Sequence, residues 1–184
     1  MEIQSPDRLV RLAVDLVNTR TLDPEQLISP ASLRTFLLEH GEPEPVDVND
    51  HDLTAVRAIR ERLRPVFQAQ LQTDAHAGTR AAAGVLNGLL AEYAVKPYLS
   101  DHDGAPWHLH VAEPDASWAE WLAATTALGL ATFVAGHGFG ALGVCAAVDC
   151  ERVFANPAER RPRRFCTPRC ATRTRVAAHR SRNS

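Results

Sequence analysis

Residues 145–180 read CAAVDCERVFANPAERRPRRFCTPRCATRTRVAAHR, and this stretch contains all four cysteines of the 184-residue chain. Their spacing is C-x4-C, then fifteen residues, then C-x3-C. Two close cysteine pairs joined by a short loop can turn four sulfurs toward one tetrahedral ion. The sequence therefore predicts one structural Zn²⁺ per chain, with four ligands: Cys145, Cys150, Cys166 and Cys170.

Disulfides and unrelated free thiols are the alternatives for these cysteines. The N-terminus carries Glu2 and Asp7 and shows no uninterrupted apolar segment typical of a signal peptide, so we expect a cytoplasmic protein. Disulfides are rare in that reducing compartment, which favours zinc. Iron–sulfur ligation is a smaller alternative, disfavoured because the tight cysteine runs of ferredoxins are absent.

The residues between the cysteine pairs suggest how this segment folds. Val153-Phe154 and Arg164-Phe165 are expected to form the arms of a short hairpin, and Thr167-Pro168 is typical of a helix start. Cys170 then falls in the first helical turn. A hairpin followed by a helix that supplies the last ligand is a treble-clef-like zinc module. About forty residues with few large apolar side chains should need the metal to fold.

Charge is divided sharply along the chain. Residues 1–144 hold 10 basic and 19 acidic side chains (net −9), and residues 145–184 hold 10 arginines against 3 acidic side chains (net +7), which together give −2. Four thiolates add −4 and one Zn²⁺ adds +2, so metal binding would change the net charge of residues 145–184 from +7 to +5. Such asymmetry favours nucleic-acid binding, although a solvated helix or docking on the acidic body is the alternative. The predicted DNA contacts are Arg160, Arg161, Arg163, Arg164, Arg169, Arg173, Arg175 and Arg180.

The first part of the chain has mostly helical apolar spacing, so the predicted fold class is mainly α with one small β-hairpin. The hairpin is expected from Val95–Leu99 and Trp107–Val111. The most apolar window, Trp121–Gly136, is too short for a membrane span and is expected to be a buried helix. We expect a helical domain over 1–136, a Gly-rich linker over 137–144 and the zinc module over 145–184.

Other candidate sites have weaker signals. His108 and His110 share one face of the expected strand, and the pattern favours an exposed polar face over a metal site. Asp15 and Asn18 lie three residues apart, which suggests a ligand pocket or buried network, with capping or solvation as the alternative. Residues 136–140 follow a helix and lack a lysine, which favours a linker over a phosphate loop. Because no nucleophile with a spaced base emerges, no enzymatic reaction is predicted.

Two motifs carry a family resemblance. Residues 145–180, with Phe154, Arg164-Phe165-Cys166 and the closing run 170–180, resemble the CGNR zinc finger of bacterial transcription regulators. Residues 12–19, LAVDLVNT, are similar to the opening motif of the ABATE domain that precedes this finger. The name-giving Cys-Gly-Asn-Arg is Cys-Ala-Thr-Arg here (residues 170–173), so the metal ligand and the arginine persist. If glycine and asparagine help to form the DNA-facing helix start, their replacement alters DNA affinity or sequence preference.

The resemblance implies a stress-associated transcription regulator with a C-terminal DNA-binding finger. Together with the charge pattern, it leads us to expect DNA as a partner, a small-molecule or protein effector at the helical domain, and no membrane association. Dimerisation is plausible because one small finger buries little DNA surface. The alternative function is a zinc-finger protein–protein interaction module without direct DNA binding.

Overall fold

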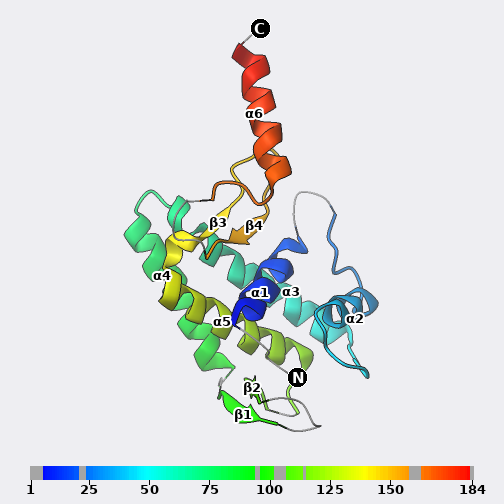
Figure 1. Ribbon diagram of the computed structural model, residues 1–184. Helices are drawn as coiled ribbons and strands as arrows, with labels where there is room; N and C mark the ends of the chain where they lie inside the picture. The colour runs from blue at the N-terminus through cyan, green and yellow to red at the C-terminus, as the bar shows by residue number, and fades with distance from the viewer. Residues whose placement is uncertain are drawn as a thin grey trace.

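A computed structural model describes residues 6–20, 24–93, 96–101, 107–113, 115–157 and 163–182 (Figure 1). Over these ranges the chain is mainly helical, as predicted. The α-helices are α1 (Pro6–Asn18), α2 (Pro30–Glu39), α3 (Asp50–Gln68), α4 (Ala75–Glu92), α5 (Trp118–His137) and α6 (Pro168–Arg182), with 3₁₀ turns η1 (Ala69–Leu71) and η3 (Phe139–Ala141). We call α1–α5 the helical body and residues 142–182 the C-terminal module.

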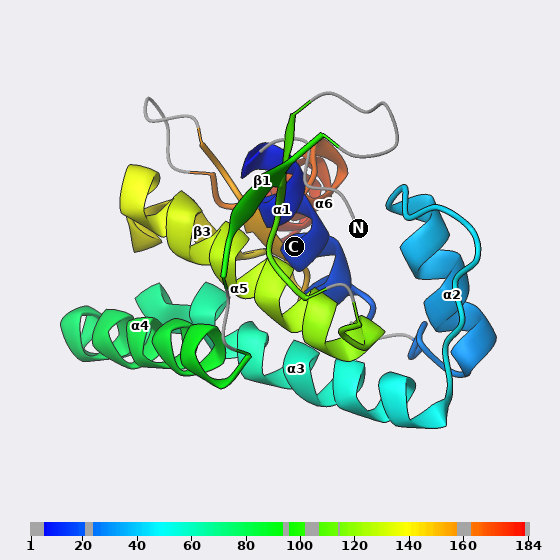
Figure 2. The same cartoon turned by 90° about the horizontal axis from the view of Figure 1, so that it is seen from below.

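Helix α5 lies at the centre of the helical body, between α1 on one side and α3 and α4 on the other (Figure 2). It is long and apolar enough to cross a membrane, but most of its residues are buried inside this fold. Leu122 and Leu130 are fully buried. Gly129 lets α1 approach closely, because a Cβ at this position would lie 2.5 Å from the Cβ of Leu9. Helix α5 is therefore the core helix that its composition predicted.

The helix starts follow from side-chain caps. Ser117 and Glu120 form a capping box at the start of α5, and their S-x-x-E spacing is the sequence signature of this motif. Helix α3 is capped by Asn49, whose side-chain oxygen accepts hydrogen bonds from the free backbone N–H groups of the first turn. Helix α4 begins after its cap Asp74, and Gly78 lies in its first turn. A Cβ on Gly78 would meet the Ala69 carbonyl oxygen at 2.2 Å.

The described parts of the chain contain two antiparallel hairpins. The sequence led us to expect one hairpin in the helical part and another between the cysteine pairs. Strands β1 (Tyr98–Ser100) and β2 (His108–His110) form the first, as predicted. Strands β3 (Leu142–Val144) and β4 (Val153–Ala155) form the second. The expected pairing of Val153-Phe154 with Arg164-Phe165 is therefore wrong, because the chain folds back on itself directly after Cys145 and places β4 beside β3.

The second hairpin joins the helical body to the C-terminal module. Leu142 and Val153 belong to the apolar core of the body, whereas Phe154 packs in a separate small cluster with the cysteines. The stretch 137–144, which the sequence suggested as a Gly-rich linker, contains the end of α5, η3 and β3. In Figure 1 the hairpin lies against the body and α6 projects away from it.

Candidate metal centre and its junction with the helical body

The four cysteines of the C-terminal module converge. Cys145 follows β3, Cys150 precedes β4, Cys166 precedes α6, and Cys170 lies in the first turn of α6. The Sγ–Sγ distances are 3.7 Å for Cys150–Cys166, 3.7 Å for Cys166–Cys170 and 3.9 Å for Cys150–Cys170. All four sulfurs lie within 4.8 Å of one another. In the part of the chain that the structure describes, this is the one cluster of potential metal ligands.

These distances test which chemistry the site supports. Four thiolates bound to Zn²⁺ at about 2.3 Å in a tetrahedron lie about 3.8 Å apart. A disulfide would bring two sulfurs to about 2.05 Å, and all four cysteines are free thiols here. The sulfur positions therefore fit one tetrahedral ion that prefers soft ligands.

The backbone around the sulfurs is also organised for a metal. The Cys166 N–H points at the Cys145 sulfur at 3.4 Å, and the Cys145 N–H donates to the Arg152 carbonyl at 2.9 Å. Asp149, just before Cys150, has a φ of 59°, in the left-handed region. This conformation tightens the first cysteine loop (residues 145–150), and aspartate tolerates it better than most residues do.

The metal-free thiols differ in acidity. Burial and the neighbouring thiols raise the pKa of Cys166 to about 12. The Thr167 hydroxyl lowers the pKa of Cys170 to about 7, which makes Cys170 the most acidic of the thiols with a shifted pKa. Its position in the first turn of α6 also favours a thiolate. Because a metal binds thiolates, loading this site releases protons.

Two of the arginines predicted to contact DNA donate hydrogen bonds to the backbone of the C-terminal module. Arg173 donates to the Val148 carbonyl at 2.8 Å, which fastens α6 to the first cysteine loop. Arg163 donates to the Phe165 carbonyl at 2.7 Å and to the Cys166 carbonyl, and its guanidinium lies 5.5 Å from the Phe154 ring centroid. Both arginines therefore help to shape the metal site.

The other predicted DNA contacts that the structure describes are exposed on the C-terminal module. Arg164 stacks over Phe165 at 5.8 Å, and Arg175 donates to the Thr172 hydroxyl at 3.3 Å. Arg169 and Arg180 are exposed on α6. Arg160 and Arg161 lie outside the described residues. Helix α6 thus presents arginines to solvent along a segment that points away from the helical body (Figure 1).

Asn18, which the sequence suggested for a pocket or a network, joins the two parts of the molecule. Its side-chain amide donates to the Val153 carbonyl at 3.0 Å, and its side-chain oxygen accepts the Val153 N–H at 2.8 Å. Asn18 is buried at the end of α1 and pairs with β4 as a neighbouring strand would. It therefore positions the strand that follows Cys150.

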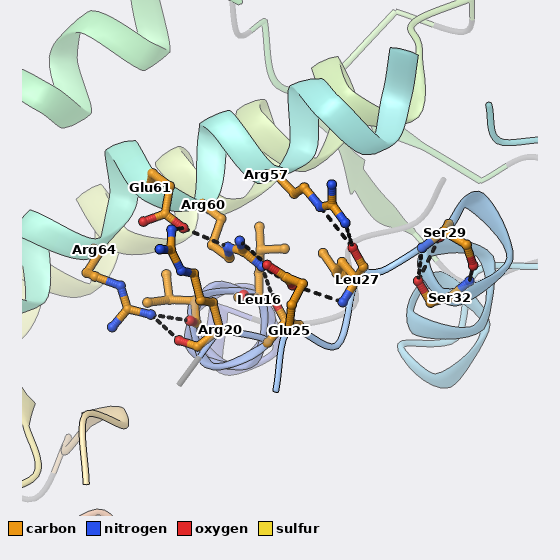
Figure 3. Close-up of polar contacts among 12 residues, drawn as sticks. Leu16, Arg20, Glu25, Leu27, Ser29, Ser32, Arg57, Arg60, Glu61 and Arg64 are labelled. Atoms are coloured by element: carbon orange, nitrogen blue, oxygen red, sulfur yellow. Dashed lines mark hydrogen bonds and ion pairs between the residues drawn. The ribbon is translucent and has the colours of Figure 1, made fainter. Parts of the chain in front are cut away.

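Sequence reasoning missed the arginines of α3, which hold the chain beyond α1 (Figure 3). Arg64 donates to the Val17 carbonyl at 2.9 Å and to the Arg20 carbonyl, and it reaches the Glu151 carbonyl at 3.5 Å. Arg60 is 2% exposed and binds both carboxylate oxygens of Glu25, at 2.6 and 2.7 Å. Arg64 thus adds a second link between the body and residues beside Cys150. The sequence signal that could have revealed these residues is the spacing of four between Arg60 and Arg64 along one helix.

Asp15 does not take part in that junction but forms a charged cluster on α1. Its carboxylate lies 3.7 Å from Arg11 and 3.3 Å from His40 Nε2. His40 Nδ1 faces the Phe36 carbonyl at 2.7 Å, so both ring nitrogens face acceptors and the imidazolium form is favoured. Burial opposes the charge, but the hydrogen bonds to Asp15 and Phe36 outweigh it and raise the pKa of His40.

Of the two strand histidines, the structure describes the side chain of His110 but not that of His108. His110 is buried and stacks on Tyr98 with ring centroids 5.1 Å apart. The expected exposed polar face is therefore wrong for His110, which contributes to packing of the first hairpin. The turn residues Asp103 and Gly104, and His102 beside them, lie outside the described residues.

Comparison with known proteins matches both parts of the chain. The model of the ABATE family, described as "Putative stress-induced transcription regulator", matches residues 10–137. The model of the CGNR zinc finger matches residues 141–183. A search of curated proteins gave no match.

Proposed function

Since the chain belongs to the ABATE family of stress-induced transcription regulators and ends in a CGNR zinc finger, we propose that it is a zinc-dependent DNA-binding transcription regulator. The observation that carries this proposal is the attachment of an arginine-rich helix to a four-thiol site. The metal, one Zn²⁺ per chain, would bind Cys145, Cys150, Cys166 and Cys170 and fix α6 relative to β3 and β4.

Zinc supplies the stability that the C-terminal module lacks. Its own apolar cluster contains four buried residues, two of which are cysteines. The helix α6 has 15 residues and is exposed over most of its length, and isolated helices of this size are marginal in water. Fixing Cys170 in its first turn gives α6 a stable starting point.

The charge and shape of α6 suit a phosphate backbone. A helix of 15 residues is about 22 Å long and narrow enough to enter a major groove about 12 Å wide. Arg169 and Arg180 are exposed on it, and Arg164 lies beside its start. Phosphate contacts by arginines supply affinity, and contacts to guanine edges supply sequence preference. We assign DNA contact to these three arginines and to Arg175.

The helical body is proposed to sense a small-molecule or protein effector. The body contacts the C-terminal module through Asn18 and Arg64, so a change in the position of the end of α1 reaches residues beside Cys150 directly. A regulator needs such a connection between the sensing part and the DNA-binding part.

Salt dependence of DNA binding tests the proposal. Fluorescence anisotropy with the full-length, zinc-loaded protein and a labelled duplex pool should show steep weakening between about 50 and about 200 mM salt. Arg169→Ala should lower the affinity and reduce the salt slope by about one. Arg80→Ala, an exposed arginine on α4, is the matched control and should bind as the unchanged protein does.

Lack of binding, or an affinity that does not change with salt, would reject DNA contact through these arginines. That result, combined with a stable complex between the zinc-loaded protein and an acidic protein partner, would support the alternative of a protein-interaction finger.

A further inference from the structure

A cavity of about 520 Å³ lies between α1 and the C-terminal module. One wall is formed by α1, with Phe133 of α5 beside it, and the other by β4 and the segment before α6. This volume is within the range of about 300–1,000 Å³ that is common for small-molecule sites. The cavity thus adjoins both the sensing body and the metal site, because Cys166 also lines it.

The lining combines an apolar surface with three arginines, of which Arg11 lies beside Asp15, whereas Arg152 and Arg163 lie on the opposite wall. Val10, Val14, Phe133 and Phe154 provide the apolar part. Arg152 is exposed and makes no ion pair with any residue that the structure describes. Arg163, on the same wall, binds backbone carbonyl oxygens and a ring face, so no described carboxylate balances its charge either.

The carboxylates of the opposite wall are already balanced. Asp15 lies between Arg11 and His40. Asp7 is in the first turn of α1, where a negative charge interacts favourably with the helix dipole. Among the described lining residues, Arg152 and Arg163 are therefore the cations without a carboxylate partner, and both lie on the side of the C-terminal module.

We propose that this cavity binds a small amphipathic carboxylate, with its apolar part against α1 and its carboxylate on Arg152 and Arg163. This inference rests on the proposed function, because it assigns the effector class and its binding site. Both walls are needed to form the cavity, so ligand binding and docking of the C-terminal module on the body are linked. A bound carboxylate stabilises the docked arrangement.

Fluorine NMR of the full-length, zinc-loaded protein tests the site without any DNA. The probes are 4-fluorophenylacetate and 6,6,6-trifluorohexanoate, each compared with its uncharged amide. We expect at least one carboxylate to bind at least tenfold more tightly than its amide, because an arginine–carboxylate contact is a charge-assisted hydrogen bond. Arg152→Gln should weaken that binding about tenfold, and Val14→Trp, which fills the cavity, should abolish it.

Controls separate this inference from the proposed function. Arg80→Ala should leave carboxylate binding unchanged, whereas removal of zinc should abolish it because one wall is lost. Absence of carboxylate-selective binding, or binding that survives both Arg152→Gln and Val14→Trp, overturns the inference even if DNA is bound. Carboxylate binding by a protein that fails the salt test with DNA would keep the site and overturn only the regulator proposal.

Discussion

The helical body and the C-terminal module reach a defined structure by different means. The body buries a contiguous apolar core in which Leu16, Leu33 and Leu122 are fully inaccessible. The module has one small cluster around Phe154 and relies on four sulfurs that face one another. The body is thus stable through burial of apolar surface, whereas we propose that the module requires an ion. If so, the C-terminal module can unfold while the helical body stays folded.

Removing the metal should have the largest effect, because it should unfold the C-terminal module and leave the helical body folded. Structural zinc contributes about 10–16 kcal/mol in small fingers, so a chelator or Cys166→Ser should unfold α6 and abolish DNA binding. Circular dichroism should lose the helicity of α6 alone and keep that of α1–α5. Mass spectrometry under native conditions should show one zinc before treatment. A cooperative loss of all helicity would show that the helical body and the C-terminal module do not unfold independently.

A cavity in the body should have the opposite effect. Leu122→Ala removes a fully buried side chain from α5 and should lower the free energy of unfolding of the body by about 2–5 kcal/mol. Urea denaturation followed by circular dichroism measures this change. Zinc affinity, determined by competition with a chelator, should change little by comparison. An equally large loss of zinc affinity would show that the two parts fold as one unit.

The junction should respond to Asn18→Ala. This substitution leaves the buried N–H and carbonyl of Val153 without their partner and should cost about 1–3 kcal/mol. Hydrogen exchange at the Val153 amide should accelerate while exchange in α4 stays the same. Arg62→Ala is a control for loss of a polar side chain, because Arg62 of α3 forms an exposed ion pair with Glu92 of α4 and takes no part in the junction.

Arg173 and Arg169 should differ although both lie on α6. Arg173 fastens the first cysteine loop through the Val148 carbonyl, so Arg173→Ala should lower zinc affinity about tenfold, as expected for loss of a charged hydrogen bond. Arg169→Ala should leave zinc affinity unchanged and weaken DNA binding only. Chelator competition and anisotropy, performed on both variants, compare the two effects. If the Arg173→Ala and Arg169→Ala variants bind zinc equally tightly, Arg173 does not support the metal site and its proposed role is limited to DNA contact.

The smallest effect should come from pH. The pKa of His40 is raised in the folded protein, so the stability gained from the protonated His40–Asp15 pair is complete below the unfolded-state pKa of about 6.5. It is lost as the pH rises through the raised pKa. Thermal melts should therefore show a small decline in stability from about pH 6 to pH 9, and Asp15→Asn should flatten it. An unchanged decline in Asp15→Asn would assign it to other groups.

Several features could be predicted because they depend on neighbours in sequence. The spacing of the four cysteines, the capping box at Ser117 and Glu120, and the apolar composition of α5 are local patterns, and each has its expected counterpart in the structure. Belonging to the ABATE and CGNR families was evident from two short motifs. The partner of β4 was not predictable in this way, because Val153-Phe154 is equally suited to pair with either flanking segment.

The sequence by itself determined the ingredients: helices, metal-binding thiols and an excess of arginine confined to residues 145–184. Tertiary structure alone decided which distant backbone groups the polar side chains contact. Asn18 meets Val153 across 135 positions, and the exposed Arg173 donates to the Val148 carbonyl. Such contacts depend on where a distant backbone group lies after the core and the cysteine cluster have formed. A backbone carbonyl has no sequence signature, and therefore spacing and composition do not reveal these partners.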